Sequence, residues 1–120
     1  MRAAILVVED DPDSCAQILT LLEGEGYAVD TAADGYAAMT YLRSRPPPRL
    51  VLLNLAIAAD DGWLFLTARR ADAALARVPV VVLSGDGKGM RPAALALGAA
   101  RLLSKPVNAA ALLVTAGRYR

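Results

Sequence analysis

The fold is decided by the stretch Leu50-Val51-Leu52-Leu53-Asn54-Leu55, a continuous apolar run with one polar residue near its end. A run of this length between turn signals is typical of a strand that is buried on both faces of a sheet. Pro46-Pro47-Pro48 ends the element before it, and Ala59-Asp60-Asp61-Gly62 is typical of a loop that leads into a helix. Asn54 is therefore expected near the carboxyl end of a central strand, where open α/β sheets bind their ligands.

The composition fits one globular domain, which we expect to span residues 1–120. Of the 120 residues, 56% are hydrophobic and 21% are charged, and the formal net charge is +1, so no global charge favours nucleic acid or a membrane surface. No run approaches the roughly 20 apolar residues that a membrane-spanning helix needs. No signal-peptide pattern follows Met1, and the single cysteine, Cys15, cannot form an internal disulfide. We therefore expect a cytoplasmic location.

Apolar runs that suit buried strands alternate with segments that suit helices. The strands are expected at Ala3–Val8, Tyr27–Thr31, Leu50–Leu55, Val78–Ser84 and Arg101–Ser104. The helices are expected from Pro12 to Gly24, from Gly35 to before Pro46, from about Gly62 to Ala71, from Pro92 to Gly98, and from Asn108 to about Arg118. Gly85–Gly89 is expected to be a flexible loop. This alternation predicts an α/β fold, with a doubly wound five-stranded parallel sheet covered on both faces.

Polar side chains collect where the predicted strands end. They are Glu9, Asp10 and Asp11 after the first strand, Asn54 in the third, Ser84 in the fourth and Lys105 after the fifth. In a sheet of order 2-1-3-4-5 the first, third and fourth strands are neighbours, and the ligand crevice lies between the first and the third. We therefore expect these carboxylates, the amide, the hydroxyl and the ammonium to face one crevice.

At these residues the chain resembles a receiver domain of a bacterial two-component response regulator, over essentially its whole length. The resemblance rests on Ile5–Asp13, Leu50–Leu55 with Asp61-Gly62, Pro79–Ser84, Gly98-Ala99 and Ser104-Lys105-Pro106. It implies the CheY-like, flavodoxin-like (βα)5 fold with strand order 2-1-3-4-5. It also implies a part in phosphorelay signal transduction, and we expect no catalytic activity of this chain's own.

The resemblance implies a role for each pocket residue. In the family an acidic pair holds Mg²⁺, and Glu9 and Asp10 match it, together with a main-chain carbonyl that is here the one of Ala56. An aspartate at the end of the third strand accepts a phosphoryl group from a histidine kinase. Ser84 and Lys105 match the hydroxyl and the lysine that contact the phosphoryl oxygens.

Asn54 stands at the position of that phosphoacceptor aspartate. A carboxylate can attack phosphorus, whereas a neutral amide is a poor nucleophile because its nitrogen lone pair is delocalised. The amide also brings no charge to Mg²⁺, so we expect weak or absent Mg²⁺ binding and no required cofactor. Leu102 replaces the usual Tyr or Phe at the switch position, and Ala58 replaces a usual proline. These departures predict a pseudo-receiver that is not phosphorylated at Asn54.

Such a module would act through protein–protein contacts. The expected partner is a histidine kinase, an effector domain or another receiver, bound to the face formed by the segments 92–98, 101–104 and 108–118. The same face could pair two copies of the chain. We expect no nucleic-acid binding by this domain, because it has no basic recognition helix. Lys105 is expected to form a static ion pair with Asp10.

Two alternative functions remain open. The first is a conventional phosphoacceptor receiver whose native aspartate has been replaced by Asn54. The second is a flavodoxin-like small-molecule binding module that uses the same crevice. The acidic turn after the first strand argues against the second, because it lacks the Gly-rich cradle that binds phosphate.

Overall fold

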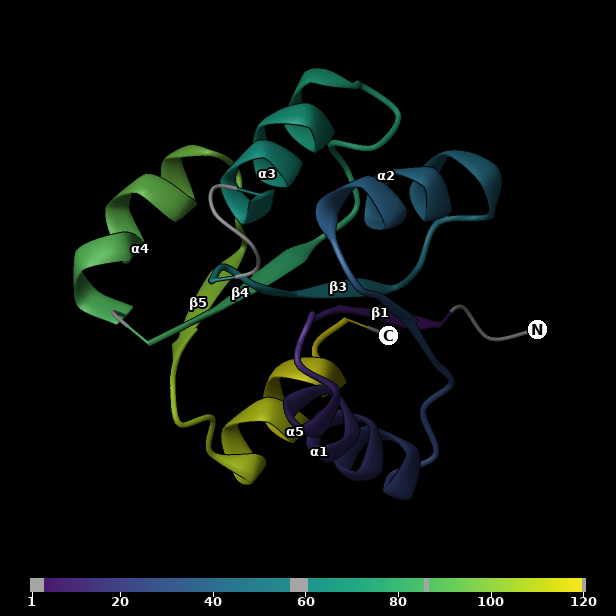
Figure 1. Ribbon diagram of the computed structural model, residues 1–120, viewed down its shortest axis with the longest axis vertical. Coiled ribbons are helices and arrows are strands. Elements are labelled where there is room, and N and C mark those ends of the chain that lie inside the picture. The colour runs from purple at the N-terminus through teal and green to yellow at the C-terminus, as the bar shows by residue number, and fades with distance from the viewer. Residues whose placement is uncertain (1–3, 57–60, 86, 120) are drawn as a thin grey trace.

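Strand β3 (Leu50–Asn54) lies at the centre of a five-stranded parallel sheet of order β2-β1-β3-β4-β5 (Figure 1). The computed structural model describes residues 4–56, 61–85 and 87–119. The other strands are β1 (Ile5–Val8), β2 (Val29–Ala32), β4 (Val80–Ser84) and β5 (Arg101–Ser104). The helices are α1 (Pro12–Gly24), α2 (Gly35–Ser44), α3 (Asp61–Ala71), α4 (Gly87–Ala96) and α5 (Ala109–Gly117). The predicted fold class and strand order are confirmed.

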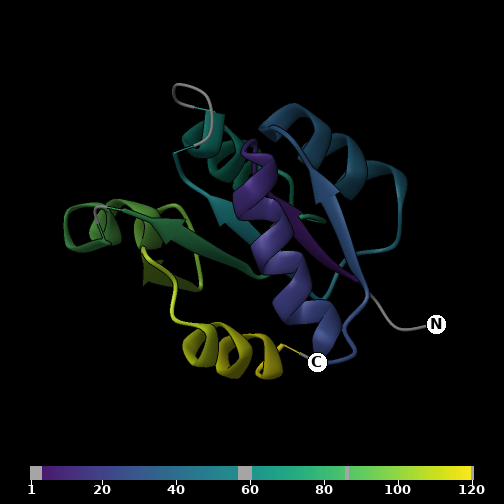
Figure 2. The same cartoon turned by 60° about the horizontal axis from the view of Figure 1, so that its bottom comes forward.

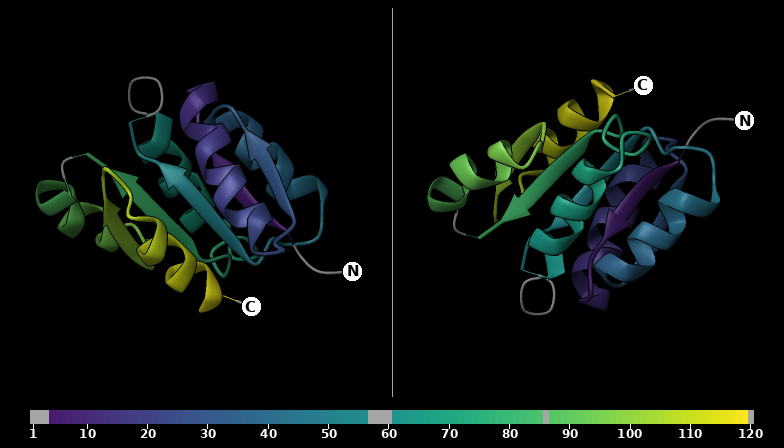
Figure 3. Two further views of the ribbon diagram at one scale, coloured as in Figure 1. Left: turned by 90° about the horizontal axis from the view of Figure 1, so that it is seen from below. Right: turned by 90° about the horizontal axis from the view of Figure 1, so that it is seen from above.

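Successive residues of the central strands supply two separate cores, because side chains alternate between the faces of a sheet. Val51 and Leu53 of β3 pack with α2, α3 and Ala94 of α4 on one face. Leu50 and Leu52 pack with α1 and α5 on the other face. Figure 3 shows these two helical layers from either side, and Figure 2 shows α1 and α5 together against the sheet. Burial on both faces explains why these strands are continuous apolar runs.

Three predicted helix starts are confirmed by their caps. The side chain of Asp11 accepts a hydrogen bond from Ser14 N at the start of α1. Asp34 caps α2 and Asn108 caps α5 in the same way, each accepting from the backbone N–H three residues on. A cap side chain satisfies one of the free N–H groups of the first turn, which is why these residue types mark helix starts.

Helix α4 begins at Gly87 rather than at the predicted Pro92, which lies inside the helix. The prediction was wrong because it treated the proline as a first helical residue and the glycines before it as a loop. A proline inside a helix costs one backbone hydrogen bond. Packing of the fully buried Ala94 against the sheet helps to offset that cost. The loop prediction for Asp86 lies outside the described residues.

Strand β2 begins at Val29, two positions after the predicted Tyr27. Tyr27 N donates to Leu22 O at 3.1 Å, so Tyr27 still belongs to the turn that ends α1. Gly26 lies in this turn at φ +88°, a conformation that favours glycine. An aromatic residue after two glycines is typical of a strand start, and only the backbone contact to α1 shows otherwise.

Candidate functional site

The carboxyl ends of β1, β3 and β4 meet at one edge of the sheet. Val8 pairs with Leu53, and Asn54 pairs with Leu83, so Glu9, Asn54 and Ser84 follow one another along this edge. Glu9 and Asn54 are each 6% exposed, and Ser84 is 5% exposed. The structure therefore brings these three of the predicted polar groups to one edge of the sheet.

The Asn54 side chain bridges a carboxylate and an ammonium. Its Nδ2 donates to Glu9 Oε2 at 2.5 Å, and its Oδ1 accepts from Lys105 Nζ at 2.6 Å. The same Oδ1 also accepts from Ala56 N at 3.2 Å. A carboxylate only accepts and an ammonium only donates, so these partners fix which end of the amide carries the nitrogen. Both ends of the amide are engaged within the protein.

Glu9 is held from several directions. Besides the amide, its Oε2 accepts from Asp10 N at 3.0 Å, a contact that closes the turn after β1. A buried carboxylate needs such donors, because removing its charge from water is costly. Asp10 itself is exposed, and Asp11 serves the α1 cap rather than the pocket. Hydrogen bonds from the Ser14 hydroxyl and then from its backbone N–H hold the pKa of Asp11 below its ordinary value.

Lys105 contacts Asn54, a partner that we did not expect. Lys105 N donates to Ser84 O at 2.9 Å, which places this residue directly after β5 and beside the end of β4. From there its Nζ reaches the Asn54 oxygen. The Lys105–Pro106 peptide bond is cis. The Asn54 side-chain amide lies between the carboxylate of Glu9 and the ammonium of Lys105.

The remaining predicted site residues have different surroundings. Leu102 is 2% exposed and packs in the core beneath the α3–α4 face, so it does not lie at the surface. Ala56 is exposed, and the contact that it makes to Asn54 comes from its N–H rather than its carbonyl. Ala58 and Asp60 lie outside the described residues.

The donor set at this edge does not fit Mg²⁺ as the side chains are arranged. Mg²⁺ requires several hard oxygens in near-octahedral geometry. Here Glu9 Oε2 faces an N–H group, and Asn54 Oδ1 faces an ammonium. Among the described residues there is no group of three or more His, Cys, Asp and Glu side chains that could hold a metal ion. A metal that took Glu9 Oε2 or Asn54 Oδ1 as a ligand would compete with these hydrogen bonds.

Two contacts outside the pocket were missed from the sequence. Asp61 was expected as part of the loop that leads into its helix, but its Oδ2 accepts from Gly35 N at 2.6 Å and so ties the start of α3 to the start of α2. Arg69 is only 3% exposed and donates to Val78 O and Gly98 O. Burial lowers the pKa of the Arg69 guanidinium. Basic residues in a last helical turn are typical of a solvated helix end, so no sequence signal marked this one as buried.

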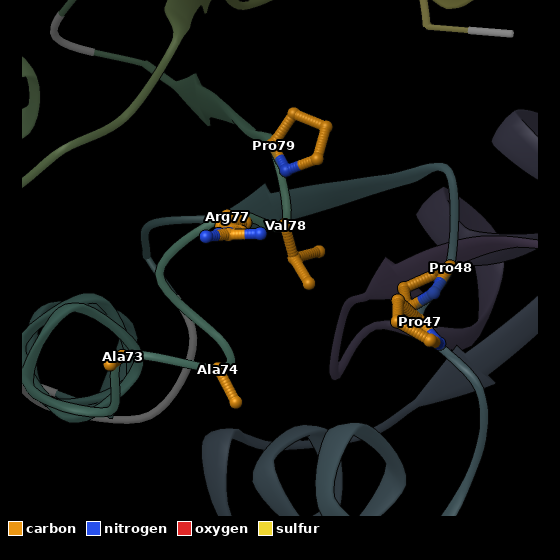
Figure 4. Close-up of a pocket in the computed structure, with 7 residues that line it drawn as sticks. All are labelled: Pro47, Pro48, Ala73, Ala74, Arg77, Val78 and Pro79. Carbon is orange, nitrogen blue, oxygen red and sulfur yellow. The ribbon is translucent and has the colours of Figure 1, made fainter.

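A hollow of about 580 Å³ lies at the opposite, amino-terminal edge of the sheet. Figure 4 shows the side chains that line it. Its lining residues come from the segments before β3 and β4, and they are Pro47, Pro48, Ala73, Ala74, Arg77, Val78 and Pro79. Among the described residues of this lining, Arg77 is the one charged side chain, and no carboxylate or nucleophile accompanies it. The hollow is wide, but its described lining offers fewer charged and hydrogen-bonding side chains than the Asn54 edge of the sheet.

A sequence profile of the response regulator receiver domain matches residues 5–116. The chain is 33% identical over 109 residues to the response regulator PleD of Caulobacter vibrioides, covering 90% of this chain and 24% of PleD. It is 34% identical over 121 residues to the nitrogen assimilation regulatory protein NtrX of Azorhizobium caulinodans, covering 98% of this chain and 26% of NtrX. The chemotaxis response regulator CheY4 of Vibrio cholerae superimposes with a TM-score of 0.87 at 26% identity, covering 100% of both chains.

The chain therefore belongs to the response regulator receiver domain family, whose members are signalling domains of two-component systems. Receiver domains interact with histidine kinases and effector domains, and they can bind Mg²⁺ at the phosphorylation site. The chain spans about a quarter of the length of PleD and NtrX. In the part of the chain that the structure describes, no helix is long and apolar enough to cross a membrane.

Proposed function

We propose that this receiver domain signals without being phosphorylated at Asn54 and without Mg²⁺, through protein–protein contacts. The observation that carries the proposal is the Asn54 bridge to Glu9 and Lys105. The amide supplies the donor that Glu9 needs and the acceptor that Lys105 needs, so the pocket is satisfied without a metal or a phosphoryl group. The amide also offers no nucleophilic oxygen of its own.

We further propose that residues 1–120 form one receiver-like domain and that its partner binds the face formed by α4, β5 and α5. This face includes β5, which is an edge strand of the sheet and pairs with a described strand on one side only, so its other side offers backbone groups that another chain can contact. Leu95 on α4 is 43% exposed, which supports an apolar contact there. A histidine kinase, an effector domain or a second receiver, including a copy of this chain, would fit this role. The face is tested by measuring how a surface-tethered partner binds the chain and its Leu95→Asp variant, which places a charge on this face.

The test of the proposal is phosphotransfer from acetyl phosphate in the presence of Mg²⁺. The given chain and its Asn54→Asp variant are each incubated and then read by intact mass for a gain of one phosphoryl group. The given chain should stay unmodified, because the amide cannot form an acyl phosphate. The proposal would be overturned if the given chain gained a phosphoryl group and its Asn54→Ala variant did not.

The conventional receiver with a replaced aspartate remains the second candidate. It is favoured by the position of Lys105, whose Nζ lies 2.6 Å from the side chain at position 54, and by the buried Ser84 beside it. Phosphorylation of the Asn54→Asp variant would show that the pocket needs only an acceptor, which favours this candidate. Failure of both proteins to react would show that the pocket as a whole has lost the chemistry.

A further inference from the structure

A cavity of about 290 Å³ lies between α1 and α5, on the face of the sheet away from α3. We call it the α1–α5 cavity. On α1 its wall is formed by Ser14, Ile18 and Leu21, which share one face of the helix because they are spaced by four and three residues. Leu112 of α5 lies on the other side. In Figures 2 and 3 the two helices run over the same face of the sheet.

One end of the α1–α5 cavity is charged. Glu9 and Lys105 both line it, and these are the two groups that Asn54 bridges. A ligand head with a single charge would be attracted by one of them and repelled by the other. A head with both charges meets both favourably. Asn54 shows that a group which donates on one side and accepts on the other satisfies this pair.

Away from this charged end the cavity is small and mostly apolar, with the polar side chains of Ser14 and Gln17 on α1 as the exceptions. Ile18 and Leu112 are buried side chains of the core on this face of the sheet, so the wall that they form is held in place by packing. A volume of 290 Å³ corresponds to about ten water molecules at roughly 30 Å³ each, which is the space for a ligand of about ten non-hydrogen atoms. Ligand sites typically combine such apolar walls with a few convergent polar groups.

We propose that the α1–α5 cavity binds a small apolar zwitterion, with the chemistry of an apolar α-amino acid. Its ammonium would face Glu9, its carboxylate would face Lys105, and its side chain would lie between Ile18, Leu21 and Leu112. The ligand's carboxylate would compete with Asn54 for the Lys105 ammonium. Binding would therefore shift the segment between β5 and α5. A ligand shifts an equilibrium only by its differential affinity for the two states.

This inference rests on the proposed function, because it assigns to the ligand the input that phosphorylation would otherwise provide. Phosphorylation of the given chain would refute the proposed function whatever the cavity binds. An unmodified chain that fails to bind the zwitterion would refute the inference alone. The two failures are therefore distinguishable on the same purified protein.

The experiment is a titration of the ¹⁵N-labelled chain with L-leucine and L-phenylalanine, followed by NMR. Saturable shifts are expected at backbone amides of α1 and of residues 105–112, with a Kd below about 1 mM. N-acetyl-L-leucine, which lacks the cation, and L-leucinamide, which lacks the anion, should each bind at least about tenfold more weakly. The absence of saturable shifts at about 10 mM of either amino acid would overturn the inference.

A filling variant localises the binding. Leu21→Trp places a larger side chain in the cavity and should weaken binding at least about tenfold, because the ligand would have to displace it. Glu23→Trp makes a comparable change at an exposed position of α1 outside the cavity lining and should leave binding unchanged. Ile18→Phe serves as a second filling variant if Leu21→Trp does not fold. Shifts that persist in a folded filling variant would contradict the proposed site.

Discussion

Replacing Asn54 by aspartate should destabilise the protein when no metal is present. The new carboxylate would be repelled by Glu9, whose oxygen now lies 2.5 Å from the amide nitrogen, and attracted by Lys105, now 2.6 Å from the amide oxygen. Two unit charges about 4 Å apart interact by about 4 kcal/mol at an effective dielectric constant of about 20, so these two terms largely cancel. What remains is at least the lost hydrogen bond to a charged acceptor, about 1.5–3 kcal/mol, to which the burial of one more charge adds.

The expected loss of about 2 kcal/mol corresponds to a fall in Tm of roughly 6–10 °C for a domain of this size. Urea denaturation of the given chain and of Asn54→Asp, each in EDTA, measures it. Adding about 10 mM Mg²⁺ should restore about 2–3 kcal/mol to the variant if it binds with a Kd of about 0.1 mM, and should leave the given chain unchanged.

Asn108→Asp is the matched control, because the same chemical change there alters only the exposed α5 cap that accepts from Ala111 N. Its effect should stay within about 0.5 kcal/mol, since both residue types cap helices well. The reasoning would be refuted if Asn54→Asp were as stable as the given chain in EDTA. It would equally be refuted if Mg²⁺ stabilised the given chain as much as the variant.

Three further predictions concern the scaffold around the pocket. Arg69→Met should lower the free energy of unfolding by about 2–4 kcal/mol, measured by urea denaturation. The substitution leaves the carbonyls that Arg69 now satisfies, including Gly98 O at 3.1 Å, without a donor. A loss of less than about 1 kcal/mol would contradict this prediction. Burial, followed by the hydrogen bond to Asp30, raises the pKa of Tyr41 to about 12. The folded state therefore holds this proton more tightly than the unfolded one. The resulting stability, about 1 kcal/mol after allowance for solvent screening, is present below pH ~10 and is lost as the pH rises through about 12. The stability gap between the given chain and Tyr41→Phe should close over that range, and a gap that does not depend on pH would argue against the contact. Gly62→Ala should lower Tm by more than about 5 °C, since its Cβ would lie 2.8 Å from the backbone carbonyl oxygen of Leu55. An unchanged Tm would show that the backbone at Leu55 moves aside freely.

The sequence predicted the sheet well because its signals are local. Each central strand is buried on both faces and so consists of a continuous apolar run, as in Leu50–Asn54. Asp11, Asp34 and Asn108 act on backbone groups three residues away, so their role follows from spacing alone. The start of α4 was wrong because local proline and glycine preferences were outweighed by packing against the sheet.

The candidate site was predicted as a collection of residues but not as a set of bonds. Strand order was enough to bring Glu9, Asn54 and Lys105 to one edge of the sheet. Which group would bond to which depends on side-chain reach after folding, and charge alone did not indicate Asn54 as a partner of Lys105. The buried Arg69 and the α1–α5 cavity depend on how helices pack on the sheet, which no short-range pattern encodes.

The most direct test of the central claim is to observe the Asn54 side-chain amide itself. The two Nδ2–H resonances, assigned by their loss in Asn54→Asp, are followed by NMR while about 10 mM Mg²⁺ and then acetyl phosphate are added. The account predicts that both resonances keep their positions and stay protected from exchange, because the amide remains bonded between Glu9 and Lys105. Resonances that shift on addition of Mg²⁺, as the amide oxygen turns from Lys105 to the metal, would contradict it.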